Sequence, residues 1–304
     1  MRGGRVRTRA GGEARRSAFQ FGGEPPESAT PPSSSRRSHT QMSDCIVERA
    51  DGVMVIRFNR PERMNSLGGT LLSEFNEALL AGRADDSVRA FVVTGEGRAW
   101  NAGADLQAMG GGQRNENSAR WNALDPIGEV GRTVLNIRHC DKPTIAAVNG
   151  VAVGGGFGLC SAFDIRIASD QARFSTVFIK RALAPDCGLS WFLPRLVGPE
   201  RASELFFTGR MVDAKEALDL GIVSRVVPHE TLMDEAMTLA RTIANSPPSA
   251  MVFTRRAIHA SLTQTLEQHL EYEWVNQKAC LRAPEFQEGV KAFLEKREPD
   301  WSKF

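Results

Sequence analysis

The chain has 304 residues, of which 41% are hydrophobic and 24% charged, and its formal net charge is +2. These proportions are ordinary for a globular protein with a large buried core. No run of about 18 apolar residues occurs, so no transmembrane helix and no membrane partner are expected. The five cysteines are scattered and form no CxxC pair. Neither a disulfide framework nor a metal site is therefore indicated, and a reducing cytoplasm is the expected location.

The first 41 residues differ in composition from the rest of the chain. They carry eight arginines and three glutamates, which gives them a net charge of +5 and leaves −3 for residues 42–304. The body therefore shows no positive excess that would attract nucleic acid. A segment so rich in Arg, Gly, Ser and Pro is expected to be disordered over residues 1–43, as an extension upstream of an alternative start at Met42. A transit peptide is the other interpretation of this composition.

From Cys45 onward, short apolar runs alternate with helical patterns. A strand is predicted at 52–59, followed by a helix over 70–81 with Thr70 as its N-cap. Further strands are predicted at 89–97, 143–150, 164–170 and 221–227. Beyond Pro228 the pattern is helical, with apolar stripes at 232–243 and 286–294. This order predicts an α/β core followed by a helical C-terminal region.

The stretch "VAVGGGFGLC" (151–160) places three consecutive glycines where a strand and tight loop lead into a helix. The first N–H groups of a helix have no internal partners and lie at its positive end. Without side chains in the way, a negatively charged or polarised oxygen can approach them. Close packing of the helix is the alternative reason for the glycines. Neither the GxGxxG nor the GxxxxGK[ST] pattern is present, which argues against the usual dinucleotide and phosphate loops.

A second stretch, "GEGRAWNAGADLQAM" (95–109), also runs from a strand end through small residues towards a helix. With "VNGVAVGGGFG" it resembles the crotonase superfamily of enoyl-CoA hydratases and isomerases. Other matching stretches are "FNRPERMNSL" (58–67), "KPTIAAVNG" (142–150), "FDIRIASDQARF" (163–174), "LPRLVG" (193–198), "LFFTGRMVDAKEALDLGIVSRVV" (205–227) and "GVKAFLEKREP" (289–299).

The resemblance, which spans about residues 44–301, implies a ClpP/crotonase-like spiral core of repeated ββα units. The core is expected over 44–240, and a helical trimerisation region over 241–304. In this family two backbone N–H groups form an oxyanion hole for an acyl-CoA thioester, and the matching residues are Ala104 and Gly155. Such donors stabilise the enolate that forms when a proton α to the thioester is removed.

The acid and base positions of the family's hydratases carry no titratable side chain here. Those hydratases use two glutamates, and the matching residues in this chain are Gly158 and Phe178. Asp186, in "ALAPDCGLSWFLPRLVG" (182–198), resembles the catalytic Asp of dienoyl-CoA isomerases, epoxyphenylacetyl-CoA isomerase and chlorobenzoyl-CoA dehalogenase. An apolar acyl pocket would raise its pKa. A turn Asp is the alternative, because Pro-Asp-x-Gly favours a β-turn.

The resemblance also implies residues that bind CoA and the acyl group. They are Arg63 and Met64 beside the nucleotide, Ala102, Asp105 and Leu106 along the pantetheine, Gly154 and Phe178, and Phe293 and Lys296 in the last helix. Phe178, with Phe174, Trp191 and Phe192, is expected either to form the apolar acyl pocket beside Asp186 or to belong to the ordinary core. Asp105 has an alternative role in ordering its loop. Asp125 and Glu129 lie in a variable segment (110–130) that covers the acyl pocket in this family. The histidines are expected on surfaces, and the basic pieces at 254–259 and 294–298 on solvated helix faces.

These expectations together favour an enzyme that isomerises the double bond of an enoyl-CoA, with Asp186 as acid and base. No cofactor is expected beyond the CoA of the substrate, and the assembly should be a homotrimer or a dimer of trimers. A hydratase with non-standard water activation is one alternative, and a CoA-thioester-binding protein of low activity is another. RNA binding, which one branch of the family shows, is disfavoured by the acidic body.

Overall fold

The computed structural model describes residues 43–107 and 124–304. All but Ser43 of the extension predicted to be disordered lies outside these residues, as does most of the segment 110–130. Met42–Phe304 form one compact unit. No helix in the described part of the chain is long and apolar enough to cross a membrane. The predicted boundary at residue 240 lies inside α9 (Leu232–Ala244), and the division into core and C-terminal region stays a prediction.

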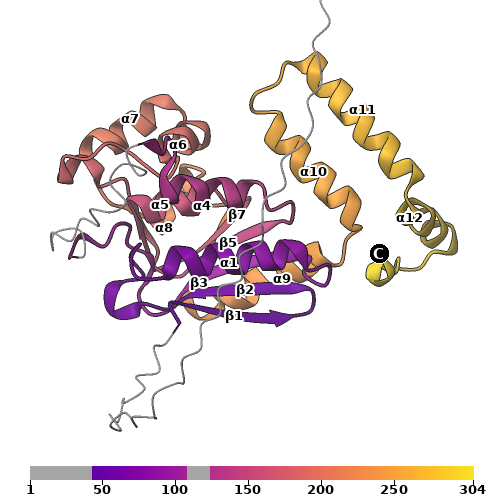
Figure 1. Ribbon diagram of the computed structural model, residues 1–304, viewed down its shortest axis with the longest axis horizontal. Helices are drawn as coiled ribbons and strands as arrows, with labels where there is room; N and C mark the ends of the chain where they lie inside the picture. The colour runs from indigo at the N-terminus through magenta and orange to yellow at the C-terminus, as the bar shows by residue number, and fades with distance from the viewer. Residues whose placement is uncertain (1–42, 108–123) are drawn as a thin grey trace, which may run out of the picture. The chain divides into compact units, whose positions relative to one another are not determined.

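A six-stranded sheet forms the centre of the α/β core (Figure 1). Its order is β1 (Cys45–Ala50), β2 (Val53–Phe58), β3 (Ala90–Gly95), β5 (Thr144–Val148), β7 (Ile165–Ser169) and β10 (Arg225–Val227). Only the β1–β2 pair is antiparallel. The inner parallel strands are covered on both faces, which is why they read as continuous apolar runs. The predicted strand at 221–227 is shorter in the structure, because Gly221 turns the chain with φ +78° and the N–H groups of Ile222 and Val223 donate to the carbonyl oxygen of Ala217.

Helices cover both faces of this sheet and bury alternate residues of the same strands. Val53, Val55 and Val92 pack against α9 on one face. Met54, Ile56 and Phe91 face a second cluster that includes side chains of α1 (Leu71–Ala84), α4 (Gly128–Arg138) and α5 (Gly155–Ser161). The helix predicted over 70–81 is thus confirmed. Thr70 precedes α1, but its hydroxyl donates to Glu74 Oε1 (2.6 Å) and does not cap the helix.

A second sheet of short strands positions the loops that follow. Its order is β4 (Ala99–Asn101), β6 (Val151–Val153), β8 (Arg173–Ser175) and β9 (Val212–Asp213). β4 and β6 are parallel neighbours, with Asn101 beside Ala152. The loops that leave their carboxyl ends therefore start side by side, as in other parallel sheets that carry a site at this edge.

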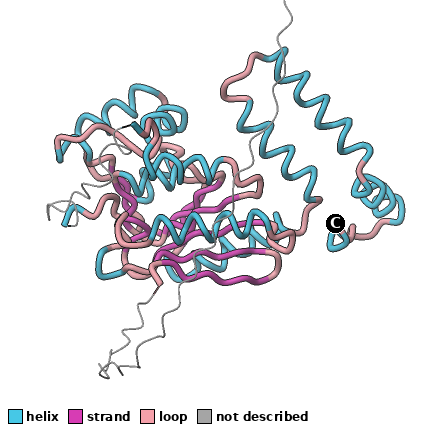
Figure 2. The backbone as a smooth tube through the Cα atoms, viewed as in Figure 1, coloured by secondary structure: helices cyan, strands magenta, loops and turns pink. Residues whose placement is uncertain are grey.

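The remaining elements follow β8 in chain order and are mostly helical (Figure 2). They are η3 (Phe178–Arg181), α6 (Leu189–Val197), α7 (Pro199–Thr208), α8 (Ala214–Asp219), η4 (His229–Thr231), α10 (Pro248–Ala260), α11 (Leu266–Arg282), α12 (Pro284–Glu295) and η5 (Trp301–Lys303), and η1 (Pro61–Arg63) precedes α1.

The basic stretch at 254–259, which we expected on a solvated helix face, instead anchors α10 to the core. Arg255 is 5% exposed and donates to Asp164 Oδ2 (2.7 Å) and to the carbonyl oxygens of Arg138 (2.8 Å) and Ile137 (2.9 Å). His259 lies 2.8 Å from the other oxygen of Asp164 and is mostly covered, so the prediction of a surface histidine is wrong there. The buried carboxylate of Asp164 provides the physical reason, because it requires cationic partners.

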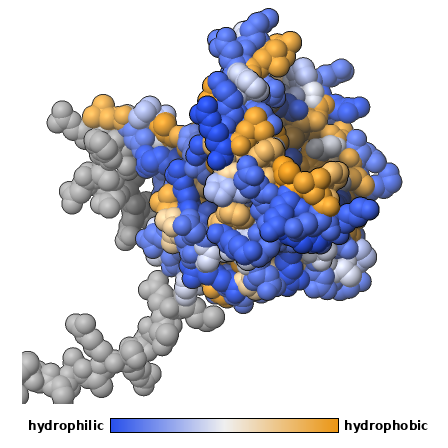
Figure 3. All heavy atoms as spheres, turned by 90° about the vertical axis from the view of Figure 1, so that its right-hand side faces the viewer, coloured by the Kyte–Doolittle hydropathy of each residue, from blue (hydrophilic) through white to orange (hydrophobic). Residues whose placement is uncertain are grey.

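The last two helices expose many apolar side chains. Figure 3 shows apolar residues gathered on the face that carries these helices. The large exposed apolar residues of α11 and α12 are Leu266, Leu270, Trp274, Val275, Leu281, Phe286, Val290, Phe293 and Leu294. The predicted stripe at 286–294 is therefore helical but is not covered within one chain.

Candidate active site

The loop after β4 and the start of α5 are in direct contact. A methyl group placed on Gly103 would lie 3.2 Å from the backbone nitrogen of Gly155 and 2.7 Å from the carbonyl oxygen of Val153. Gly103 also has a positive φ of +77°, so this approach requires glycine. The structure thus brings together the two segments that the sequence predicts to carry the oxyanion donors.

The backbone N–H group of Ala104 points away from the neighbouring backbone at Leu67. Leu67 N donates to the carbonyl oxygen of Gly103 (2.7 Å), and Asp105 N donates to that of Leu67 (3.3 Å). This is a parallel bridge between Leu67 and Ala104. In such a bridge the residues on either side of Ala104 bond to Leu67, while the N–H and C=O of Ala104 point the other way. The N–H of Ala104 is therefore available to a ligand.

Gly155, the second predicted donor, occupies the first position of α5. The first backbone N–H groups of a helix have no intrahelical acceptor. A methyl group on Gly155 would lie 3.0 Å from Leu67 Cδ1, 3.1 Å from Cys187 Sγ and 3.4 Å from Asp186 Oδ1. Gly155 thus faces the same Leu67 whose bridge orients Ala104, and it also faces the proposed acid and base.

The neighbouring glycines serve packing, which was the alternative explanation for the run. A methyl group on Gly156 would lie 2.2 Å from the carbonyl oxygen of Asn101 in β4. Gly154 has φ +56° and donates its N–H to the carbonyl oxygen of Ser175 in β8 (2.9 Å). Both roles therefore occur in one run: Gly154 and Gly156 fit α5 against the second sheet, and Gly155 borders the site.

Asp186 lies in the loop between η3 and α6, where its carboxyl group is accessible to solvent. Partial burial beside its loop raises the pKa of Asp186 above the ordinary value of 3.8, and the Cys187 thiol opposes this shift. Cys187 itself is 3% exposed, and burial raises the pKa of its thiol, so that it remains a protonated side chain rather than a nucleophile. Cys187 was not singled out from the sequence.

At the two positions that hold glutamates in hydratases, Gly158 has no room for a larger side chain and Phe178 is buried. A methyl group on Gly158 would lie 2.5 Å from Cys187 Cβ and 2.9 Å from its carbonyl oxygen. The Asp186–Cys187 backbone thus fills the space that a larger residue at 158 would need. Phe178 is 6% exposed and belongs to the main core cluster.

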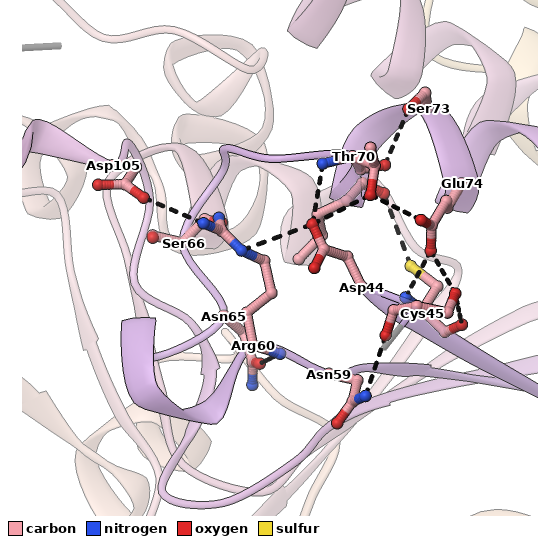
Figure 4. A network of polar contacts seen from close by, with 12 residues as sticks. Asp44, Cys45, Asn59, Arg60, Asn65, Ser66, Thr70, Ser73, Glu74 and Asp105 are labelled. Atoms are coloured by element: carbon pink, nitrogen blue, oxygen red, sulfur yellow. Dashed lines mark hydrogen bonds and ion pairs between the residues drawn. The ribbon is translucent and has the colours of Figure 1, made fainter. Parts of the chain in front are cut away.

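A polar network holds the loop that carries Ala104 (Figure 4). Arg60 lies at its centre and bonds to Asp105 Oδ2 (3.2 Å) and the carbonyl oxygen of Ser66 (2.8 Å), with Asp44 Oδ2 at 3.6 Å. The side chains of Arg60 and Asp105 are only 12% and 8% exposed. Asp105 therefore orders the loop through an ion pair, and its predicted contact with pantetheine stays a prediction. Arg60 stands in a matched motif, although the sequence alone did not identify its role.

The other residues predicted to bind CoA fall into two groups. Ala102 N donates to the carbonyl oxygen of Met64 (3.0 Å), which joins the predicted nucleotide and pantetheine positions. Arg63 reaches Gln107, and Leu106 is 45% exposed. Phe293 is 81% exposed in α12, and Lys296 ends that helix with φ +54°. The structure brings the first group to the site loops, and the second lies on the apolar C-terminal helices.

The remaining acidic candidate in the described part of 110–130 is already paired. Asp125 accepts hydrogen bonds from Arg132 and from the backbone of Gly128 (3.0 Å), and these contacts lower its pKa to about 2. A carboxylate held in its charged form is a poor proton donor. Glu129 is exposed on α4. Across residues 43–107 and 124–304, no group of three His, Cys, Asp or Glu side chains is arranged to hold a metal ion.

Comparisons with known proteins agree with this geometry. The family model for enoyl-CoA hydratase/isomerase matches residues 48–303. The 1,2-epoxyphenylacetyl-CoA isomerase of Escherichia coli (strain K12) is 36% identical over 83% of this chain and 95% of its own length. A "Probable enoyl-CoA hydratase" of Mycobacterium tuberculosis is 40% identical over 80% of this chain and 87% of its own. The crystal structure of an enoyl-CoA hydratase from Bacillus anthracis superposes with a TM-score of 0.80, at 33% identity, over 86% of this chain and all of that one.

Proposed function

The chain belongs to the enoyl-CoA hydratase/isomerase family, and from this premise we propose that it isomerises the double bond of an enoyl-CoA with Asp186 as both acid and base. Family membership supports an acyl-CoA thioester as the substrate. The position of Asp186 supports the choice of isomerisation within the family.

One observation carries the proposal: a carboxylate oxygen of Asp186 borders Gly155, while the two hydratase positions hold a glycine and a buried phenylalanine. Hydration needs groups that activate and orient water. Isomerisation needs one group that removes a proton and returns it elsewhere. A single carboxyl group with a raised pKa is suited to both halves of that transfer.

In the proposed reaction the thioester oxygen accepts hydrogen bonds from the N–H groups of Ala104 and Gly155. Asp186 removes a proton from the carbon α to the thioester of a β,γ-enoyl-CoA. The electron pair of that C–H bond moves onto the carbonyl oxygen and forms a dienolate, which the two N–H groups stabilise. The protonated Asp186 then returns the proton to the γ carbon, and the double bond moves to the α,β position. No atom is gained or lost.

The proposal is tested with a panel of β,γ- and α,β-enoyl-CoA esters in deuterated water. We expect positional isomerisation and incorporation of deuterium at the α and γ carbons, together with hydration of crotonyl-CoA far below the rate of a two-glutamate hydratase. Hydration at ordinary enzymatic rates without isomerisation or exchange of any ester would refute the proposal.

A second candidate is hydration with non-standard water activation, and the 40% identity to the mycobacterial protein favours it. In that case Asp186 or a residue of segment 110–130 would activate the water. Incorporation of the heavy isotope from H₂¹⁸O into a β-hydroxyacyl-CoA product distinguishes it from isomerisation.

We also propose that the protein assembles as a homotrimer or a dimer of trimers. The exposed apolar side chains of α11 and α12 support this assembly, because a monomer rarely exposes so many without a function. In such an assembly Phe293 and Lys296 would meet the CoA bound by a neighbouring subunit. Light scattering that finds an active monomer at micromolar concentration would refute the assembly.

A further inference from the structure

A second hollow lies at the other end of α5, between α6 and α10. Its volume is about 440 Å³, and it is lined by Ser161 at the C-terminal end of α5, whereas Gly155 starts that helix. Ala104, Gly155 and Asp186 do not line this hollow, whereas Trp191 and Phe192, the candidates for acyl pocket or core, do. The apolar part of its wall includes Trp191, Phe192, Leu196, Met251, Ile258 and Leu262.

Four arginines and one carboxylate also line the hollow. The arginines are Arg138, Arg166, Arg195 and Arg255, and the carboxylate is Asp164. Asp164 is already neutralised, because it bonds to Arg255 (2.7 Å) and lies 2.8 Å from His259. Asp164 also acts electrostatically on Arg138 and Arg166, but one carboxylate cannot balance the four guanidinium groups that line the hollow.

Within the described residues none of the three arginines other than Arg255 makes an ion pair. Arg166 donates to the carbonyl oxygens of Phe163 and Ile222, each at 2.7 Å. The guanidinium of Arg195 stacks 4.0 Å from the centre of the Trp191 ring. These contacts hold the guanidinium groups in place and contribute no negative charge.

Arg138 is the least satisfied of the three. Its guanidinium is half-buried 5.7 Å from the centre of the Phe192 ring, and in the described chain it donates no hydrogen bond. Burial lowers the pKa of Arg138, the charge of Asp164 opposes this shift, and the charges of Arg255 and Arg166 lower the pKa further. An anion in the hollow would relieve this repulsion and bond to donors that have no acceptor among the described residues.

We propose that the hollow between α6 and α10 binds a small carboxylate with an apolar body. The carboxylate accepts hydrogen bonds from Arg138, and the apolar body packs against Trp191 and Phe192. A guanidinium presents its donors in a planar fork that matches a carboxylate. The wall is mostly apolar, which favours an alkyl carboxylate over a fully hydrated anion such as inorganic phosphate.

Calorimetric titration of the full chain with hexanoate, hexanamide and inorganic phosphate tests the proposal. We expect hexanoate to bind at least tenfold more tightly than hexanamide or phosphate. Arg138→Met should weaken hexanoate binding by about ten- to hundredfold, the usual range for a lost hydrogen bond to a charged group. The matched control is Arg201→Met, which removes an exposed arginine of α7 that does not line the hollow and should leave binding unchanged.

The same titration with Asp186→Asn separates this hollow from the candidate active site. Unchanged hexanoate affinity in that variant supports binding at the second site. A change of more than threefold would place hexanoate in the active site and overturn the proposal. Equal binding of hexanoate and hexanamide, unaltered binding by Arg138→Met, or no binding at millimolar concentrations would also overturn it.

Discussion

Replacing Gly158 with alanine should disturb the loop that carries Asp186. The new methyl group would lie 2.5 Å from Cys187 Cβ, whereas carbon atoms in contact settle at about 3.5–4.0 Å. The Asp186–Cys187 backbone must therefore move by about 1 Å. Overpacking of this kind costs about 1–3 kcal/mol. A displacement of about 1 Å at a catalytic group can reduce turnover about a hundredfold.

Gly289→Ala provides the matched control, because its methyl group would meet Trp301 at an ordinary distance of 3.4 Å. Both glycines lie inside helices, where alanine is favoured by up to about 1 kcal/mol. The difference in unfolding free energy between the two variants therefore isolates the steric effect at Gly158.

The measurements are urea unfolding and the rate of enoyl-CoA isomerisation. We expect Gly158→Ala to be less stable than Gly289→Ala by about 1–3 kcal/mol and to lose most of its turnover. Wild-type turnover in Gly158→Ala would show that the position of the Asp186 loop does not control the chemistry, and that the reasoning from this contact is wrong.

Further predictions concern the acid and base and the anchor of α10. Asp186→Asn should lower turnover by about a hundredfold or more while CoA-thioester affinity changes only a few-fold, and an unchanged rate would leave Asp186 as a turn residue. Because the pKa of Asp186 is raised, the acidic limb of the pH–rate profile should lie above pH 3.8 and disappear in the same variant. Arg255→Met should lower the free energy of unfolding in urea by about 3–5 kcal/mol, because it leaves the buried Asp164 without its main partner. Arg256→Met, which removes the exposed ion pair with Asp141, should change it by less than about 1 kcal/mol. Burial raises the pKa of Asp164, but His259 and Arg255 lower it to about 2. The charged carboxylate therefore contributes about 2 kcal/mol to the free energy of unfolding above pH 4, and this contribution is lost as the pH falls towards 2. Asp164→Asn should abolish that part of the pH dependence of unfolding.

The sequence by itself determined the inner strands and the identity of the site loops. Strands β2, β3 and β5 are covered on both faces, so each appears as a mostly apolar run that a local pattern identifies. β7 (IRIAS) contains Arg166 and is fully buried only over its last three residues. The two glycine-containing loops were identified because close backbone approach leaves glycines in the chain. β1 escaped prediction, since its sequence CIVERA is mostly exposed and partly charged.

Only the tertiary structure decided which polar groups meet. Arg60 and Asp105 are 45 positions apart, and Arg255 and Asp164 are 91 apart. In the sequence Arg255 looked like part of a solvated basic face, and Asp105 was predicted to line the pantetheine, with ordering of its own loop as the alternative. A hydrophobic period is local, because burial repeats with the geometry of one helix or strand. An ion pair between distant segments leaves no such period, since its partners are neighbours only after the chain has folded.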